Sequence, residues 1–97
     1  MSVFFLAEIK EISDDDMYRK YIEKAEPIIK KYGGEYIFRS EQLNPISGDW
    51  ELKRIILIQF ASKEKVRECY QSNECKEIAH LRENSTISKA IVIEECS

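Results

Sequence analysis

Short segments with a two-residue hydrophobic period alternate with longer helical segments along this chain. Residues 3–12 alternate between two faces, and the first half of this segment is apolar on both, which predicts a β-strand. Residues 35–41, 53–60 and 87–94 are three further predicted strands. In 35–41 the alternation puts Tyr36 and Phe38 on one face and Ile37 and Arg39 on the other. Because the centre of 53–60 is apolar on both faces, we expect both faces of that strand to be covered.

A helix is predicted between the first two strands. Ser13 precedes three consecutive aspartates, and a serine cap followed by acids suits the positive end of a helix dipole. Apolar residues then recur at spacings of three and four until Gly33 and Gly34, which are expected to end the helix. Pro27 removes a backbone hydrogen bond, so it is expected to bend or interrupt the helix.

The second helical segment follows the third strand. Ser62 is expected to cap it, and Val66 and Cys69 share its apolar side. Ser72 and Asn73 indicate a break and a new cap, after which the helical pattern continues.

The order of the predicted elements is βαββαβ, which is typical of a ferredoxin-like sandwich in the α+β class. In this fold two helices lie on one face of a four-stranded antiparallel sheet. The strands at 3–12 and 53–60 are nevertheless apolar on both faces, so the second face needs a partner. The simplest partner is a second copy of the same sheet. We therefore expect residues 1–97 to form a single domain that pairs as a dimeric α/β barrel.

Composition narrows the range of expected partners. The net charge is −3 with both signs interspersed, which argues against a nucleic-acid-binding surface. No apolar run approaches the roughly 20 residues that cross a bilayer, so no membrane partner is expected and a cytoplasmic location is the default. Cys69, Cys75 and Cys96 are expected to be free thiols in a reducing compartment. Neither a metal site nor a cofactor is predicted.

A series of short motifs runs in order along the chain, and their spacing together is more specific than any one of them. They are Tyr18 with Tyr21, Tyr32-Gly33-Gly34, Arg39, Gly48-Asp49-Trp50, Arg54, Phe60, Ser62, Tyr70-Gln71-Ser72, Glu74 and Arg82. On these residues nearly the whole chain resembles the bacterial family called domain of unknown function 1330, in the dimeric α/β-barrel superfamily. The resemblance implies the fold, a homodimer and a candidate pocket, but the family has no established common reaction. The chain departs from the family pattern at Ser40-Glu41, where glycine usually follows the arginine, and at Cys75, where tyrosine is usual.

Two arginines are candidates for binding an anionic ligand. Arg39 ends a predicted strand beside aromatic residues, and its guanidinium could bind a carboxylate or an enolate-like oxygen. The alternative is a structural pair with an acid at the sheet edge. Arg82 lies late in the second helical segment and could reach into the space between helix and sheet. The alternative for Arg82 is compensation of the helix dipole.

Two aromatic residues complete the predicted ligand-binding set. Trp50 lies in the only long predicted loop, 42–52, where it could wall a pocket or anchor the loop. Tyr70 lies at the break in the second helical segment, where its hydroxyl could donate to an oxyanion or simply reach the rim of the core.

These residues support three hypotheses about function. The first is a cytoplasmic protein that binds a small anionic or aromatic metabolite between helices and sheet. The second is a cofactor-independent enzyme of monooxygenase-, isomerase- or cyclase-like type, which only fold analogy supports. The third is a structural or interaction dimer. Convergence of Arg39, Tyr70 and Arg82 on one cavity without acidic partners favours binding, whereas acidic partners or full exposure favour the interaction module.

Overall fold

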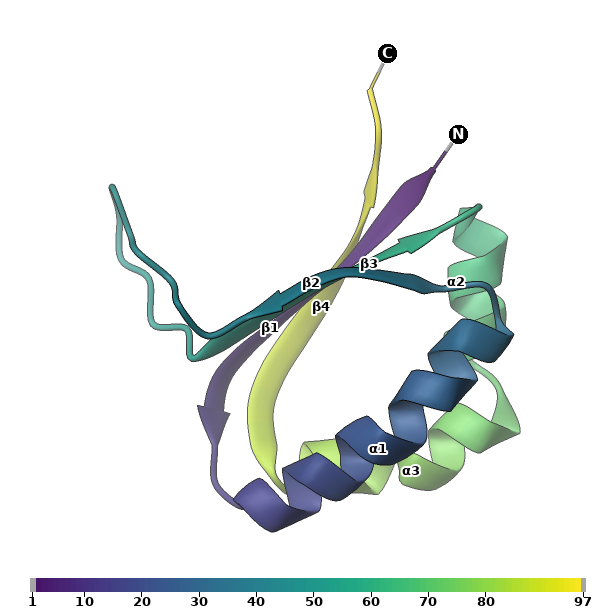
Figure 1. The fold of residues 1–97 in the computed structure, drawn as a ribbon, viewed down its shortest axis with the longest axis horizontal. Coiled ribbons are helices and arrows are strands. Elements are labelled where there is room, and N and C mark those ends of the chain that lie inside the picture. Colours follow the sequence, from purple (N-terminus) through teal and green to yellow (C-terminus); the bar gives the residue numbers. More distant parts are fainter. Residues whose placement is uncertain (1, 97) are drawn as a thin grey trace.

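A four-stranded antiparallel sheet with three helices on one of its faces makes up the fold (Figure 1). The computed structural model describes residues 2–96. The strand order is β2-β3-β1-β4, which confirms the predicted ferredoxin-like α+β fold. The elements are β1 (Val3–Ile12), α1 (Asp15–Lys31), β2 (Glu35–Ser40), β3 (Arg54–Phe60), α2 (Lys63–Tyr70), α3 (Asn73–Glu83) and β4 (Thr86–Glu94).

Helix α1 differs from its prediction at two points. Its cap is Asp14 rather than Ser13, because the Asp14 carboxylate accepts from the Met17 N–H at 3.0 Å. The helix also runs without interruption through Pro27. Pro27 and Glu23, four residues earlier, are both exposed, so the carbonyl that the proline leaves without a partner can bind water. The predicted interruption was wrong for this reason.

The break between α2 and α3 lies where the sequence predicts it. The Ser72 hydroxyl donates to the Cys69 carbonyl at 2.7 Å and accepts from the Cys75 N–H at 3.1 Å. One side chain thus ends the first helix and starts the second. The predicted second helix is therefore two helices, and the helical layer has three.

A bulge in β2 changes which side chains face the helices. Tyr36 pairs with Ile58, but Phe38 pairs with Leu57 and Arg39 pairs with Ile56, so one extra residue separates the pairs. Tyr36 and Arg39 therefore share the helix-facing side of the sheet, and Phe38 points to the other side. The simple alternation predicted for residues 35–41, with Tyr36 and Phe38 on one face and Arg39 on the other, is corrected by this bulge.

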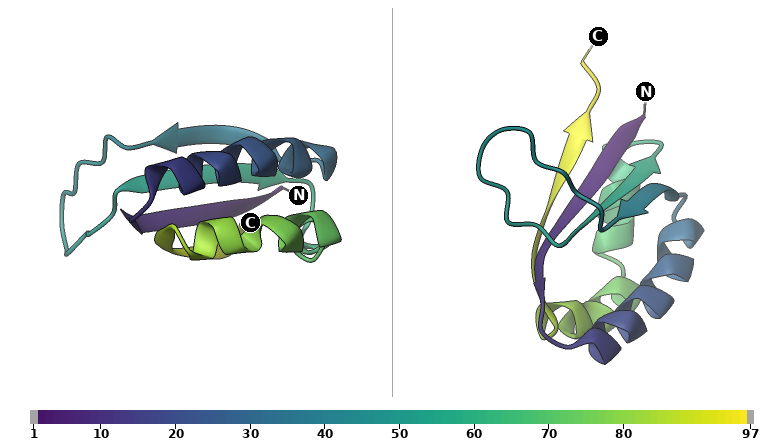
Figure 2. Two further views of the ribbon diagram at one scale, coloured as in Figure 1. Left: turned by 90° about the horizontal axis from the view of Figure 1, so that it is seen from below. Right: turned by 60° about the vertical axis from the view of Figure 1, so that its left-hand side comes forward.

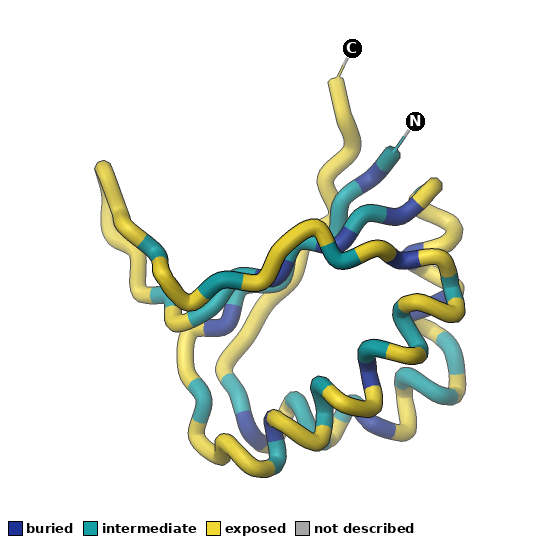
Figure 3. Tube along the Cα trace, viewed as in Figure 1, coloured by how far each residue is buried: buried dark blue, intermediate teal, exposed yellow. Residues whose placement is uncertain are grey.

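The two faces of the sheet are covered unequally. The helix-facing side carries the buried core, to which the sheet contributes Val3, Ile9, Ile56, Ile58 and Phe60. The opposite side, which we call the outer face, is covered by none of the helices within residues 2–96 (Figure 2). One row across all four strands of the outer face is apolar, and strand β4 is almost wholly exposed (Figure 3). The row consists of Phe38, Leu57, Leu6 and Ile91.

An ion pair joins the C-terminal end of α1 to the N-terminal end of α3. The Lys31 ammonium lies 2.8 Å from the Glu74 carboxylate, which also accepts from the Tyr32 hydroxyl at 3.2 Å. This hydrogen-bonded lysine lowers the pKa of Glu74, so the carboxylate stays charged at neutral pH. The two helices lie side by side facing the sheet (Figure 1).

Replacing Gly34 by alanine is expected to destabilise the domain. A Cβ at this position would lie 2.5 Å from Ile29 Cγ2 and 2.9 Å from Phe60 Cζ, both in the packed layer between α1 and the sheet. Overpacking of this kind costs about 1–3 kcal/mol. Urea denaturation followed by circular dichroism measures the change. Gly33→Asn is the control, because Gly33 has a φ of +86° and open space around it, and asparagine tolerates that conformation. Equal stability of Gly34→Ala and the wild type would contradict the prediction.

Candidate ligand-binding cavity

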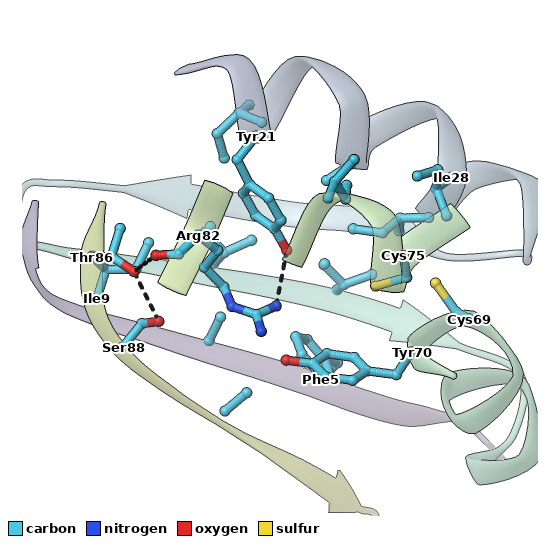
Figure 4. A pocket seen from close by; sticks show the side chains of 18 of the residues that line it. Phe5, Ile9, Tyr21, Ile28, Cys69, Tyr70, Cys75, Arg82, Thr86 and Ser88 are labelled. Atoms are coloured by element: carbon cyan, nitrogen blue, oxygen red, sulfur yellow. Dashed lines mark hydrogen bonds between the residues drawn. The ribbon is translucent and has the colours of Figure 1, made fainter. Parts of the chain in front are cut away.

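A cavity of about 440 Å³ lies between the sheet and the helical layer (Figure 4). Small side chains form part of its floor: Ala7 on β1 pairs with Ala90 on β4, and Ser88 lies two residues before Ala90 on the same strand. Larger side chains on β1 and β3 surround this part of the floor, and α1 and α3 form the roof. A volume of this size is within the range of small-molecule sites, and the lining is mostly apolar.

Arg82 is the charged group most closely enclosed by aromatic residues in the wall of the cavity (Figure 4). Its guanidinium carbon lies 5.6 Å from the ring centre of Tyr21 and 5.5 Å from that of Tyr70, so two aromatic rings flank the cation. Its Nη1 donates to the Tyr21 hydroxyl at 3.3 Å. The carboxylate of Glu83 is 3.7 Å from Nη2, but that side chain is 65% exposed. Water therefore screens this pair, and Arg82 keeps capacity for a second anion.

Hydrogen bonds at the C-terminal end of α3 hold the backbone of Arg82 in position. The Thr86 hydroxyl donates to the Arg82 carbonyl at 2.8 Å, and the buried Ser85 hydroxyl donates to the Leu81 carbonyl. These bonds satisfy carbonyls that the last turn of α3 would otherwise leave without partners. The arginine backbone is thereby held at the junction of α3 and β4, beside the cavity.

Tyr21 is a neutral hydrogen-bond donor in the wall of the cavity, and Tyr70 lies at the rim. Burial raises the pKa of Tyr21, and the neighbouring Arg82 opposes this only in part. Because the Tyr21 oxygen already accepts from Arg82, its own proton is available to another acceptor. Tyr70 packs against Phe5 with ring centres 5.5 Å apart and remains 41% exposed. It therefore lies where the cavity meets solvent.

Arg39 and Trp50 do not line this cavity. The Arg39 guanidinium lies 4.4 Å from the ring centre of Tyr36 and forms an ion pair of 3.5 Å with Glu26 on α1. Trp50 is 55% exposed and donates from Nε1 to the Ser47 carbonyl at 2.8 Å, within the loop 41–53. The structure thus brings together two of the four sequence-predicted residues, Tyr70 and Arg82, and places the other two elsewhere.

Sequence reasoning missed Tyr21 and the alanine pair as parts of the site. Tyr21 belongs to the apolar stripe of α1 and was named only among the residues of the family resemblance, although a buried hydroxyl needs a partner. Ala7 and Ala90 become informative only when the register of β1 and β4 is known.

Cys69 and Cys75 line the cavity as protonated thiols. Burial raises the pKa of Cys69 to about 11 and raises that of Cys75 as well. Since the thiolate is the reactive form, neither sulfur is an activated nucleophile. Within residues 2–96, His, Cys, Asp and Glu side chains form no group of three that could hold a metal ion. Over the same residues, no helix is long and apolar enough to traverse a bilayer.

The thiols predict a simple labelling pattern for the native protein. Cys96 is exposed and should react rapidly with Ellman's reagent, whereas Cys69 and Cys75 should react at least about tenfold more slowly because burial hinders both access and ionisation. The absorbance of the released thiolate follows the reaction, and Cys96→Ser should remove the fast phase. A fast phase of two or three thiols would contradict the packing of α2 and α3 described above.

Comparison with known proteins places this chain in a family. The profile of the family described as a domain of unknown function, DUF1330, matches residues 2–96. The chain belongs to the DUF1330 family. No curated protein is significantly similar to it in sequence.

Solved structures resemble this DUF1330 protein in fold. A protein of unknown function from Rhodopseudomonas palustris superposes with a TM-score of 0.78 at 15% identity, over 99% of this chain and 83% of that one. The cofactor-independent oxygenase SnoaB from Streptomyces nogalater gives a TM-score of 0.71 at 7% identity, over 99% and 94%. A dimeric protein of unknown function with a ferredoxin-like fold from Bacteroides fragilis gives 0.68 at 13% identity, over 97% and 96%. At such identities the likeness shows the fold alone.

Proposed function

We propose that this DUF1330 protein binds a small aromatic anion in the cavity between the helices and the sheet. The observation that carries the proposal is the Arg82 guanidinium, held between the rings of Tyr21 and Tyr70 beside a mostly apolar cavity. An arginine whose acidic neighbour is largely solvated can bind a carboxylate or enolate strongly, because its planar fork matches two oxygens at once. The apolar lining favours a hydrophobic body attached to that charged group.

The acidic neighbours of Arg39 and Arg82 distinguish the binding hypothesis from the hypothesis of a purely structural role. Arg39 has the structural features that favour the interaction hypothesis, since Glu26 pairs with it and Tyr36 stacks on it. Arg82 also has an acidic neighbour, Glu83, but this contact is 3.7 Å long and the Glu83 side chain is 65% exposed. On that ground we assign Arg82, together with Tyr70, to the binding hypothesis. The Streptomyces nogalater neighbour is described as a cofactor-independent oxygenase. Only the similarity of fold connects that activity with this chain. We propose binding in the cytoplasm, without a reaction, as the function that the site supports best.

Calorimetric titration with 2-naphthoate tests this proposal. Arg82→Gln should weaken binding by roughly tenfold to a hundredfold, because hydrogen bonds to charged groups contribute about 1.5–3 kcal/mol. Arg39→Gln is the matched control and should bind as the wild type does. An equal loss in Arg39→Gln would instead support the sequence-based assignment of Arg39 to the ligand site. Unchanged binding in Arg82→Gln would contradict the proposal.

The proposed assembly is a homodimer that forms through the outer face of the sheet. The apolar row on the outer face is contiguous across four strands, and Ile91 and Ile93 are 57% and 41% exposed in the single chain. Contiguous exposed apolar surface of this kind marks an interface more often than free surface. The Bacteroides fragilis neighbour, which is described as dimeric, adds support from a similar fold.

A further inference from the structure

Arg82 and Glu83 are oppositely charged neighbours in the wall of the cavity. Both residues line it, and Arg82 Nη2 lies 3.7 Å from the Glu83 carboxylate. Lys89 is the other charged residue that residues 2–96 contribute to the lining. Lys89 pairs with Glu8 in register, and the strand alternation that puts Leu6 on the outer face puts both of these side chains there as well. Arg82 and Glu83 are therefore the charges that a ligand in the cavity meets.

The contact between Arg82 and Glu83 is weak enough to be exchanged for another. At 3.7 Å it is too long for a hydrogen bond. Adjacent residues of a helix do not face each other, so these two side chains approach only at their ends. The Arg82 side chain is 20% exposed and enclosed by tyrosines, whereas that of Glu83 is 65% exposed. The arginine is thus held in the wall, and its Nη2 is open to an anion that offers a shorter bond.

The position of Glu83 in its helix does not explain its charge. Glu83 is the last residue of α3, where the helix dipole favours a cation such as Arg82 and disfavours a carboxylate. Within residues 2–96, the one ion pair of Glu83 is its contact with Arg82. The favourable interaction of this carboxylate is therefore with the group to which we assign the ligand anion.

An anion bound by Arg82 also lies within the electrostatic range of Glu83. An oxygen that accepts from Nη2 at about 3 Å is no more than about 7 Å from the Glu83 carboxylate oxygen. At this distance, repulsion weakens binding by about threefold for each negative charge of the ligand if water screens it fully, and by more in a partly enclosed site. A second negative charge on the ligand therefore doubles the repulsion.

We infer that Glu83 makes the cavity selective for ligands with a single negative charge and discriminates against dianionic groups such as phosphate monoesters. This inference rests on the proposed function, because it defines the charge of the anion that Arg82 binds. In the empty cavity, Glu83 partly balances the charge of Arg82. A monoanion replaces Glu83 as the partner of the guanidinium. The second charge of a dianion has no cation to pair with and lies close to the displaced carboxylate.

Two probes of equal shape and different charge test this selectivity. At pH 8, 2-naphthyl sulfate carries one negative charge and 2-naphthyl phosphate carries two, because the second pKa of a phosphate monoester is about 6. In calorimetric titrations at this pH, the wild type should bind the sulfate roughly fivefold more tightly. Glu83→Gln should bind both probes more tightly than the wild type does and bring the ratio near to one. A wild type that prefers the phosphate, or a ratio that Glu83→Gln leaves unchanged, would overturn the inference and leave the proposed function standing.

Two further variants distinguish the charge of Glu83 from its shape and from the net charge of the protein. Glu83→Asp keeps the carboxylate and should keep the preference for the sulfate. Glu77→Gln removes one charge from an exposed position of α3 outside the cavity lining, and it should bind both probes as the wild type does. Loss of the preference in Glu83→Asp, or in Glu77→Gln, would overturn the inference. Failure of the wild type to bind both probes and 2-naphthoate would overturn it together with the proposed function.

Discussion

Replacement of Leu57 by aspartate is expected to convert the proposed dimer into a monomer. Leu57 lies at the centre of the outer face, paired with Leu6 on one side and Phe38 on the other. In a face-to-face dimer, each copy would bury an unpaired carboxylate against the apolar row of its partner. An uncompensated buried charge costs about 3–5 kcal/mol, so dissociation should become easier by at least a hundredfold or so. Sedimentation velocity at micromolar concentration measures the change.

The control for this experiment is the same kind of substitution, an apolar residue replaced by aspartate, at a position outside the outer face. Ile46 is 99% exposed in the loop 41–53, which extends beyond the sheet (Figure 2). Ile46→Asp should sediment as the wild type does. Far-ultraviolet circular dichroism should show native helix content in both variants, because Leu57 faces away from the helical core. A Leu57→Asp protein that remains dimeric, or a wild type that is monomeric, would contradict the outer-face interface.

Filling the cavity from its floor is expected to abolish ligand binding while the fold persists. Ala7→Leu places three more carbon atoms over the part of the floor that Ala7 shares with Ala90. Burial of these atoms contributes about 0.8 kcal/mol per methylene, so the free energy of unfolding should stay level or rise by about 1–2 kcal/mol. A ligand that needs the same space should bind about tenfold to a hundredfold more weakly.

Two measurements on the same samples distinguish this effect from damage to the fold. Urea denaturation reports stability, and titration with 2-naphthoate reports binding. Ala61→Leu is the control, because Ala61 is exposed and lies outside the cavity. Undiminished affinity in Ala7→Leu would show that the ligand does not occupy the space above β1 and β4.

The fold was predictable from the sequence because its signals are local and repeated. The alternation in β1 and β3, the Gly33-Gly34 stop and the Ser72 cap each follow from the residues around them. The uninterrupted passage of α1 through Pro27 was not predictable in this way, because it depends on the exposure of that helix face.

The site was predictable only in part because its geometry depends on pairing between distant segments. The position of Arg39 follows from the bulge in β2, which turns this residue toward Glu26 and Tyr36. No local pattern reveals such a bulge. Arg82 and Tyr70 were identified from their places near a helix end and at a helix break, and from the family resemblance.

The location of a bound ligand decides whether the cavity between the helices and the sheet is the binding site. Two-dimensional nitrogen–proton NMR of the wild-type protein, titrated with 2-naphthoate, reports binding residue by residue. We expect the largest shifts at the amides of Ala7, Cys75, Arg82 and Ala90, which surround the cavity. Shifts confined to the loop 41–53 or to the outer face, or no shifts at all, would contradict it.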